Sequence, residues 1–406
     1  MIKVGLDIGN SKISCVVCDI KANQKTRILS FVSIPTSSIN KNVIINFQKI
    51  KSEVKEVVDI AAKESQTEIK SINLNIPISS SESLFYNSEI LINNELINDL
   101  HLKKALNQSD FFNEFSEQKV LMDFILNYQV DNKIIFDNPE GNYANILKIN
   151  LYKLLVQKNL YNTYENLFNE LNIHVANFIP TPLSSALATM NYDDQDLGGI
   201  CIDLGCSSTS IAVLENKKLV FCDSINIGSQ NITNDIARGI STTKESAERL
   251  KTLYGSVISS PSDEFEIIEV PLISSDPDQF KQINRGTINS IIKPRIEETL
   301  ELIWQKLKQY EIHKKRIKNL ILTGGGSQLE GIEDYAQIIF DSNVRLGKPF
   351  GMIGLGKVFG GPQFSQTLGT IQYQENKYET HFLKKSQNIS KNTVFSRFSS
   401  WLDQYI

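Results

Sequence analysis

Two short segments, far apart in the chain, repeat one pattern: an apolar run, Asp-x-Gly, small polar residues and a second apolar run. The first contains Asp7 and Gly9, and the second contains Asp203 and Gly205. Each pattern predicts two strands joined by a tight turn, where glycine lets the backbone bend sharply and approach a ligand closely. Turn amides and hydroxyls form an anion-binding concavity, and a nearby carboxylate can hold a metal-bound water. With a third, glycine-rich turn at 324–326, the repeat indicates a polyphosphate held from two sides.

Length and charge narrow the class of protein. The chain has 406 residues, a formal net charge of −4 and 41% hydrophobic residues. That length suits two or three domains with a sizeable core. The near-neutral balance argues against nucleic acid as a partner, because binding the phosphate backbone needs a basic face. The first residues already read as a strand, and no apolar run approaches the roughly 18 residues that span a bilayer. We therefore expect a cytosolic protein without a signal peptide.

The cysteines fit a reducing compartment, since five without framework spacing do not suggest disulfides. Cys15 and Cys18 form a C-x-x-C pair, a pattern that can mark redox or metal sites. Both lie in a predicted strand, where residues three apart point to opposite faces. We therefore expect neither a shared metal nor a disulfide.

The polar residues beside the two hairpin turns predict a phosphate site. Asp7 and Asp203, at the tips of two facing strands, would flank a metal ion that bridges phosphate oxygens. The Lys12 ammonium would act on the phosphates as a point charge. The other expected contacts are the small residues of the two turns, namely Gly9, Asn10, Ser11, Gly205, Cys206, Ser207, Ser208 and Thr209.

Two further patterns suggest where a nucleoside would bind. Glu248 and Lys251 are three residues apart on a predicted helix, so they share one face. They could present an acceptor to ribose hydroxyls and a long aliphatic stem to a base. The turn formed by Gly324, Gly325 and Gly326 would let the backbone approach a flat base or an α-phosphate. Alone, each pattern is more often a solvated ion pair or an ordinary turn; their joint order along the chain favours a nucleotide.

In this order the motifs resemble the actin/Hsp70/sugar-kinase ATPase superfamily and, within it, the bacterial cell-division FtsA family over nearly the whole chain. The resemblance implies an α/β, actin-like fold (a duplicated ribonuclease H-like fold) with two lobes that bind ATP and Mg²⁺. Two features resemble FtsA rather than the superfamily: an inserted α+β module and a C-terminal amphipathic helix after a polar linker. The stretches that carry the resemblance are 5–9, 137–141, 182–188, 291–298 and 322–329.

The resemblance also implies a division of the chain into segments. The first lobe would comprise 1–79, a connecting helix region at 166–198 and a return at 344–372. The module at 80–165 would be inserted into it, and 199–343 would form the second lobe with the nucleotide-binding helices. A flexible linker would follow at 373–392, and the membrane-targeting helix at 393–406.

Family motifs imply roles for individual residues. The first phosphate loop would contain Asp7, Gly9, Ser11 and Lys12, the second Asp203, Gly205, Ser207 and Ser208, with Glu248 and Lys251 at the ribose and base and Gly324, Gly325 and Gly326 at the adenosine. Cys206 and Ser207 replace the usual glycines of this family, and Ser210 stands where an acid is common. Thr181 lies where relatives that hydrolyse ATP well carry a longer polar or acidic side chain. Because such a group orients the attacking water, we expect slow or absent hydrolysis; Asp203 is the one catalytic candidate.

The last residues form an apolar stripe at helical spacing. Its members are Val394, Phe395, Phe398, Trp401, Leu402, Tyr405 and Ile406. A helix this short is marginal in water, but at a membrane interface it can bury its apolar side chains. One such helix binds weakly, so stable attachment would need several protomers side by side. The alternative is an ordinary terminal helix packed on the core.

The resemblance implies an ATP-binding scaffold of uncertain ATPase activity that polymerises on the inner face of the cytoplasmic membrane at the division site. It would anchor the C-terminal tail of the tubulin-like protein FtsZ and contact other division proteins through 80–165. Two alternatives are a small-molecule kinase of the same superfamily and a PilM-like platform for pilus assembly. A kinase needs a catalytic carboxylate in an acceptor cleft, and no second acidic cluster supplies one. The insert and the terminal stripe weigh against a PilM-like protein.

Overall fold

The computed structural model describes residues 1–21, 25–79, 81–108, 116–273, 280–312, 319–356 and 358–374. These residues form two compact units. The first comprises Met1–Glu82, Glu117–Lys119 and Val156–Tyr373, and the second consists mainly of Ser83–Ser116 and Val120–Leu155. The terminal helix expected at 393–406 and most of the linker expected at 373–392 lie outside the described residues. Within the described part, no helix is long and apolar enough to cross a membrane.

The first unit contains two sheets of equivalent topology. The strand order is β11-β6-β1-β2-β3-β19 in one and β14-β13-β12-β17-β18 in the other. In each, a hairpin and a third antiparallel strand are followed by two strands parallel to the first. The strands are β1 (Ile2–Ile8), β2 (Lys12–Asp19), β3 (Thr26–Pro35), β6 (Ser71–Ile76), β11 (His174–Pro180) and β19 (Met352–Ile353) in the first sheet, and β12 (Gly199–Leu204), β13 (Thr209–Glu215), β14 (Lys218–Ile225), β17 (Asn319–Thr323) and β18 (Asn343–Leu346) in the second. This repeat is the duplicated architecture predicted from the sequence.

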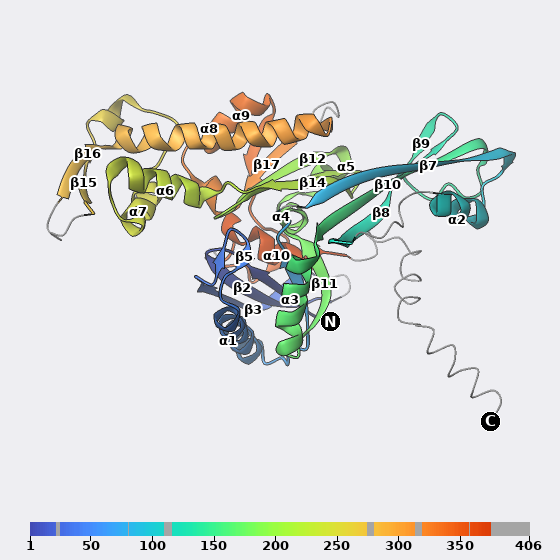
Figure 1. Ribbon diagram of the computed structural model, residues 1–406, viewed down its shortest axis with the longest axis horizontal. Coiled ribbons are helices and arrows are strands. Elements are labelled where there is room, and N and C mark those ends of the chain that lie inside the picture. The colour runs from blue at the N-terminus through green and yellow to red at the C-terminus, as the bar shows by residue number, and fades with distance from the viewer. Residues whose placement is uncertain are drawn as a thin grey trace. The chain divides into compact units, whose positions relative to one another are not determined.

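Helices cover both faces of the first sheet (Figure 1). On one face α1 (Phe47–Ser65) and α3 (Lys158–Glu170) bury a core that contains Cys15. On the opposite face Cys18 packs in a separate cluster with residues of α10 (Ser365–Gln372). All five cysteines are free. The prediction that Cys15 and Cys18 point to opposite faces is therefore confirmed.

Helix α10 packs on β1 and β6, and α4 (Thr181–Thr189) packs on the second sheet, so the two helices meet between the sheets (Figure 1). They approach so closely that a Cβ added to Gly369 of α10 would lie 1.7 Å from the carbonyl oxygen of Ser184 on α4. At the C-terminal end of α10, the ammonium of Lys3 donates hydrogen bonds to the carbonyl oxygens of Ile371 (3.2 Å) and Tyr373 (2.7 Å).

The remaining helices of the first unit belong to the second lobe. The long helix α8 (Arg285–Gln309) runs alongside the sheet of the second lobe, and α9 (Ile332–Phe340) lies next to α8 (Figure 1). Pro294 lies inside α8 without ending it. The elements are α5 (Tyr192–Leu197), α6 (Ser229–Ile240), α7 (Lys244–Tyr254), α8 (Arg285–Gln309), α9 (Ile332–Phe340), the hairpin β15 (Ile267–Pro271) and β16 (Phe280–Asn284), and, in the first lobe, the short hairpin β4 (Ile39–Asn40) and β5 (Val43–Ile44).

In the described residues of the second unit, a four-stranded sheet packs against the helix α2 (Asp99–Gln108). Its strands are β7 (Glu82–Leu96), β8 (Gln118–Val130), β9 (Lys133–Ile135) and β10 (Tyr143–Gln157). The chain returns from this unit to the first unit after Leu155, whereas the sequence predicts an inserted module that extends to 165. The difference arises because α3 buries Tyr164, Leu167 and Phe168 in the core of the first sheet, and so belongs to the first unit.

Candidate functional site

The two Asp-x-Gly turns have the same geometry. In the first, the backbone N–H of Gly9 donates to the carbonyl oxygen of Lys12 at 2.9 Å, and in the second Gly205 donates to Ser208 at 3.0 Å. A Cβ on Gly205 would lie 2.8 Å from the Ser208 carbonyl oxygen, and on Gly9 it would lie 3.1 Å from that of Lys12. Both turns are therefore closed by a contact that only glycine accommodates easily.

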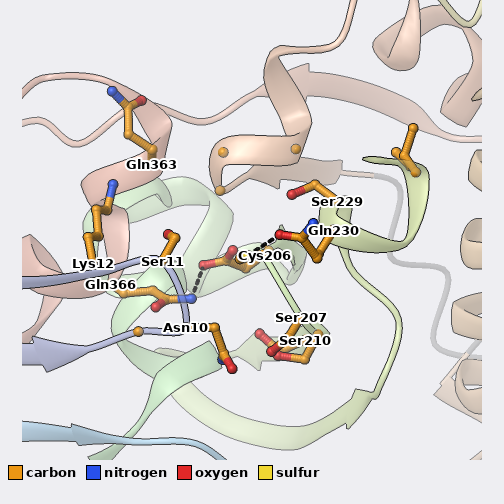
Figure 2. A pocket seen from close by; sticks show the side chains of 18 of the residues that line it. Asn10, Ser11, Lys12, Cys206, Ser207, Ser210, Ser229, Gln230, Gln363 and Gln366 are labelled. Carbon is orange, nitrogen blue, oxygen red and sulfur yellow. Dashed lines mark hydrogen bonds between the residues drawn. The ribbon is translucent and has the colours of Figure 1, made fainter. Parts of the chain in front are cut away.

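The turns meet at a cavity of about 950 Å³ within the first unit. This volume lies within the range of roughly 300–1,000 Å³ that is usual for small-molecule sites. Figure 2 shows Lys12 and Gln366 on one side of it and Ser207 and Gln230 on the other. The cavity is lined by every expected contact residue except Thr209, namely Asp7, Gly9, Asn10, Ser11, Lys12, Asp203, Gly205, Cys206, Ser207, Ser208, Glu248, Lys251, Gly324, Gly325 and Gly326. Thr209 differs from the expectation, because its hydroxyl is buried and donates to the Ile227 carbonyl oxygen at 2.7 Å.

Both carboxylates of the repeated motif are buried, Asp7 to 6% exposure and Asp203 to 2%. Asn75 donates to Asp7 Oδ1 at 3.2 Å. Burial raises the pKa of Asp7 to about 6, against the lowering effect of Asn75 and Lys12, and the charge of Asp203 raises it further. Two acidic groups thus share a buried space, where a bound cation would favour their ionised forms.

Asp203 is held through one of its oxygens only. Gln366 donates to Oδ2 at 3.0 Å, and the Ser185 hydroxyl donates to the same atom. Oδ1 is buried and has no hydrogen-bond partner among the described residues. Burial raises the pKa of this carboxyl, and the bonds from Ser185 and Gln366 lower it. An oxygen left without a partner in a buried carboxylate is an unfilled acceptor for a cation or its bound water.

Lys12 supplies a positive charge on the first side of the cavity. Its Nζ lies 3.8 Å from the centroid of the Phe364 ring, a cation–π distance. Burial lowers the pKa of Lys12, while the charges of Asp7 and Asp203 raise it. The ammonium is therefore partly desolvated, and a desolvated charge interacts more strongly with an anion than one in water.

The second turn is backed by the N-terminus of α6. The backbone N–H groups of Ser229 and Gln230 donate to the carbonyl oxygens of Gly205 (2.9 Å) and Cys206 (2.8 Å). A Cβ on Gly228, just before the helix, would lie 2.5 Å from the Cys206 carbonyl oxygen. The positive end of the helix dipole thus lies against the second turn, which favours an anion there. The Cys206 thiol is partly buried, and burial raises its pKa.

Helix α7 presents Glu248 and Lys251 to the cavity, but the ammonium of Lys251 is already engaged. It donates to Ser229 O at 3.2 Å, to Thr233 Oγ1 at 2.9 Å and to Glu248 Oε2 at 2.7 Å. The lysine side chain is 11% exposed and the glutamate 52%. Lys251 therefore fastens α7 to α6, and Glu248 is the more accessible of the pair. The base and ribose contacts assigned to them stay a prediction.

The glycine turn after β17 lies directly against Asp203. Gly324 has φ 85°, and a Cβ there would be 2.2 Å from Asp203 Oδ1. Gly326 packs on Leu204, where a Cβ would lie 3.0 Å from the leucine Cβ. A Cβ at Gly325 would lie no closer than 3.8 Å to any neighbouring atom. Glycine is therefore required at position 324 for two reasons: the backbone is left-handed there, and no space is left for a side chain.

Sequence reasoning missed the residues that hold the two carboxylates. Asn75 on β6 bonds Asp7, while Ser185 on α4 and Gln366 on α10 bond Asp203. Asn75 also accepts a hydrogen bond from the Ser184 hydroxyl. One signal was available: Asn73 and Asn75 alternate with apolar residues in a buried strand, which is unusual unless they have buried partners. For Gln366 no local signal exists.

Comparison with known proteins identifies the family. The family model for "Cell division protein FtsA" matches residues 200–369. The chain is 30% identical over 413 aligned residues to the cell division protein FtsA of Rhizobium meliloti (strain 1021), covering 98% of this chain and 93% of that protein.

Solved structures show the same fold. The PilM–PilN type IV pilus biogenesis complex matches with a TM-score of 0.62 and 16% identity, covering 91% of this chain and 97% of that one. MreB 5 of Spiroplasma citri bound to AMPPNP matches with a TM-score of 0.54 and 12% identity, covering 97% and 99%. At these identities the likeness establishes an actin-like, two-lobed α/β fold. The fold and the sequence relatives together place this chain in the FtsA family of actin-like cell division proteins.

Proposed function

We propose that this protein is an ATP- and Mg²⁺-binding scaffold of bacterial cell division, which polymerises on the cytoplasmic face of the inner membrane and anchors FtsZ there. The observation that carries the proposal is the single cavity on which both Asp-x-Gly turns, the two buried carboxylates and the glycine turn converge. ATP would act as a structural ligand that joins the two lobes and so sets the contacts between protomers.

The residues around the cavity fit ATP–Mg²⁺. Mg²⁺ is usually held by one or two carboxylates together with phosphate oxygens and water, which matches the pair Asp7 and Asp203. The unpartnered Oδ1 of Asp203 supports this assignment. The turn amides, the hydroxyls of Ser11, Ser207 and Ser208 and the charge of Lys12 would hold the phosphates, and Gly324, Gly325 and Gly326 would border the adenosine.

The site supports binding better than hydrolysis. The Thr181 hydroxyl donates to the carbonyl oxygen of Ile76 at 2.9 Å, so this short side chain is engaged with the backbone. Ser210, where relatives commonly carry an acid, is 6% exposed and uncharged. Neither residue offers a carboxylate to orient an attacking water, which supports slow or absent turnover.

The affinity for ATP–Mg²⁺ is expected to rise as the pH increases through the range around 6, because burial raises the pKa of Asp7 to about 6 and the metal requires the ionised form. The stability of the ligand-free protein should move the opposite way. The folded-state pKa exceeds the unfolded value, so stability falls as the pH rises from about 4 to about 6 and then levels off. Calorimetric titrations at several pH values test this. An affinity that is independent of pH in the wild type, or equally dependent in Asp7→Asn, contradicts it.

Membrane attachment and partners rest on the sequence and on the family. The tail stripe at 394–406 supports peripheral binding to the cytoplasmic membrane at the division site. The second unit, which corresponds to the expected insert, would contact other division proteins. The C-terminal tail of FtsZ would bind the scaffold, and association of protomers would multiply the weak grip of each tail.

Full-length protein carrying Phe398→Glu and Trp401→Glu is expected to lose most of its sedimentation with liposomes. Removing two aromatic side chains from the stripe takes away on the order of 2 kcal/mol or more of apolar burial. The bound fraction should therefore fall severalfold, both with and without ATP–Mg²⁺. A matched control is Ser396→Glu with Ser400→Glu, which adds the same charge on the polar face. If the control loses as much lipid binding as the stripe variant, or the stripe variant loses none, the anchor is not this helix.

A further inference from the structure

Asn42 lies between the two phosphate turns, although nothing in its sequence context marks it. It occupies the turn between β4 and β5, with φ 65°, a left-handed conformation that asparagine tolerates better than most residues. It is 8% exposed and lines the cavity. A polar side chain that is buried at the wall of the cavity needs a full set of polar partners.

The structure gives Asn42 that full set, drawn from both lobes. Its Oδ1 accepts from Asn10 Nδ2 of the first turn and from Ser207 Oγ of the second (3.2 Å). Its Nδ2 donates to the hydroxyls of Ser79 and Ser208, the latter at 3.3 Å. Its backbone N–H donates to Asn10 Oδ1 at 3.0 Å. An amide has two donor hydrogens and two acceptor lone pairs, and all four are used here.

The side-chain oxygen Oδ1 of Asn42 indicates how this residue relates to a bound phosphate. Two donors, one from each turn, converge on it, which is the arrangement that a phosphate oxygen between the turns would meet. The Ser207 hydroxyl has a single hydrogen, so it cannot donate to Asn42 and to a phosphate at the same time. A phosphate oxygen carries more negative charge than an amide oxygen and is the stronger acceptor.

We propose that Asn42 is a built-in stand-in for a phosphate oxygen: it joins the two turns in the absence of ligand and is displaced when nucleotide binds. The proposal rests on the proposed nucleotide site and adds a regulatory element to it. Asn42 competes with ATP for the donors of Asn10 and Ser207, so ligand-free protein keeps its turns joined and ATP must exchange those bonds to enter.

Two variants make opposite predictions. Asn42→Gly keeps the left-handed backbone but removes the competing oxygen, so the affinity for ATP–Mg²⁺ is expected to rise by roughly fivefold to tenfold. Asn42→Asp keeps the shape and supplies a charged oxygen that binds both donors more strongly and repels phosphate. Its affinity for ATP–Mg²⁺ is expected to fall at least about tenfold. Were Asn42 instead a direct ligand of the phosphates, both variants would lose affinity.

A second measurement needs no nucleotide. Cys206 lies in the second turn and is the least buried of the five cysteines, so it reports on how firmly that turn is held. Alkylation of Cys206 in ligand-free protein is expected to be several times faster in Asn42→Gly than in the wild type. The matched control is Asn172→Gly, which also replaces a left-handed asparagine (φ 56°) but at a position that does not line the cavity.

The measurements on the two Asn42 variants and on Asn172→Gly distinguish three cases. Tighter ATP binding and faster alkylation in Asn42→Gly, with weaker ATP binding in Asn42→Asp and no change in Asn172→Gly, establish the stand-in. Unchanged or weaker ATP binding in Asn42→Gly overturns it while leaving the nucleotide site intact. Failure of the wild type to bind ATP–Mg²⁺ at all overturns the nucleotide site and the stand-in together.

Discussion

Replacing Asp203 with asparagine is expected to weaken ATP–Mg²⁺ binding by roughly a hundredfold while leaving the folded protein at least as stable as the wild type. Burial raises the pKa of Asp203, which means that its ionised form is less favourable in the folded protein than in the unfolded chain. Asparagine removes that charge and still accepts the hydrogen bonds of Ser185 and Gln366 through its one oxygen. The carboxylate thus costs stability, and the proposed ATP–Mg²⁺ site would explain why the chain carries it.

The effect on affinity should be large. Loss of a charged contact to the metal and its waters is worth about 3 kcal/mol, or roughly a hundredfold in the dissociation constant. Thermal unfolding without ligand and calorimetric titration with ATP–Mg²⁺ measure the two quantities separately. Asp223→Asn is the control, because Asp223 is also buried but is paired with Lys306 at 2.8 Å and does not line the cavity. That variant should lose stability and keep its affinity. An Asp203→Asn protein that binds ATP–Mg²⁺ normally would remove this residue from the site.

The variant Gly369→Ala is expected to destabilise the protein by about 3 kcal/mol, because overpacking between two helices cannot be relieved locally. The new Cβ would lie 1.7 Å from a backbone oxygen of α4, which no side-chain rotation can avoid. The helices must move apart, and with them the groups on α4 and α10 that hold Asp203. ATP–Mg²⁺ affinity should therefore fall together with stability.

Chemical denaturation of Gly369→Ala and of a matched variant tests this. Gly356→Ala adds the same methyl group where nothing lies within 4 Å and the backbone is not left-handed. Its free energy of unfolding should stay within about 0.5 kcal/mol of the wild type. If both variants unfold at the same denaturant concentration as the wild type, α4 and α10 are less tightly packed than the structure shows.

Much of the fold could be predicted because its signals are local and repeated. The hairpins around Asp7 and Asp203 follow from their apolar runs and turn residues alone. The two halves reinforce each other, since one pattern found twice constrains topology more than either copy. The end of the inserted unit was harder to place. Helix α3 has an ordinary amphipathic sequence, and only its packing shows which core its apolar face enters.

The site was predictable where its residues lie in motifs and unpredictable where they are brought in by topology. The turn residues and the Gly324–Gly326 turn follow from the chain itself. Gln366 reaches Asp203 only because two helices from distant parts of the chain cross between the sheets. Asn42 is in a short turn with no motif, and its four side-chain hydrogen bonds become visible only in three dimensions. Thr209 was expected to face the phosphates. It lies within the strand after the turn instead, and its side chain points into the protein.

The near-identity of the two turns raises the question of which way round a ligand would bind between them. A clamp with perfect twofold symmetry would have no reason to prefer one end of a chain of phosphates over the other. Here the backbones match, but the first turn carries a cation at Lys12 where the second carries the neutral Ser208. Glu248 and Lys251 belong to the second lobe alone. Because the side chains have diverged on a duplicated backbone, the two sides of the cavity differ in charge. We therefore expect an unsymmetrical ligand to bind there in one orientation.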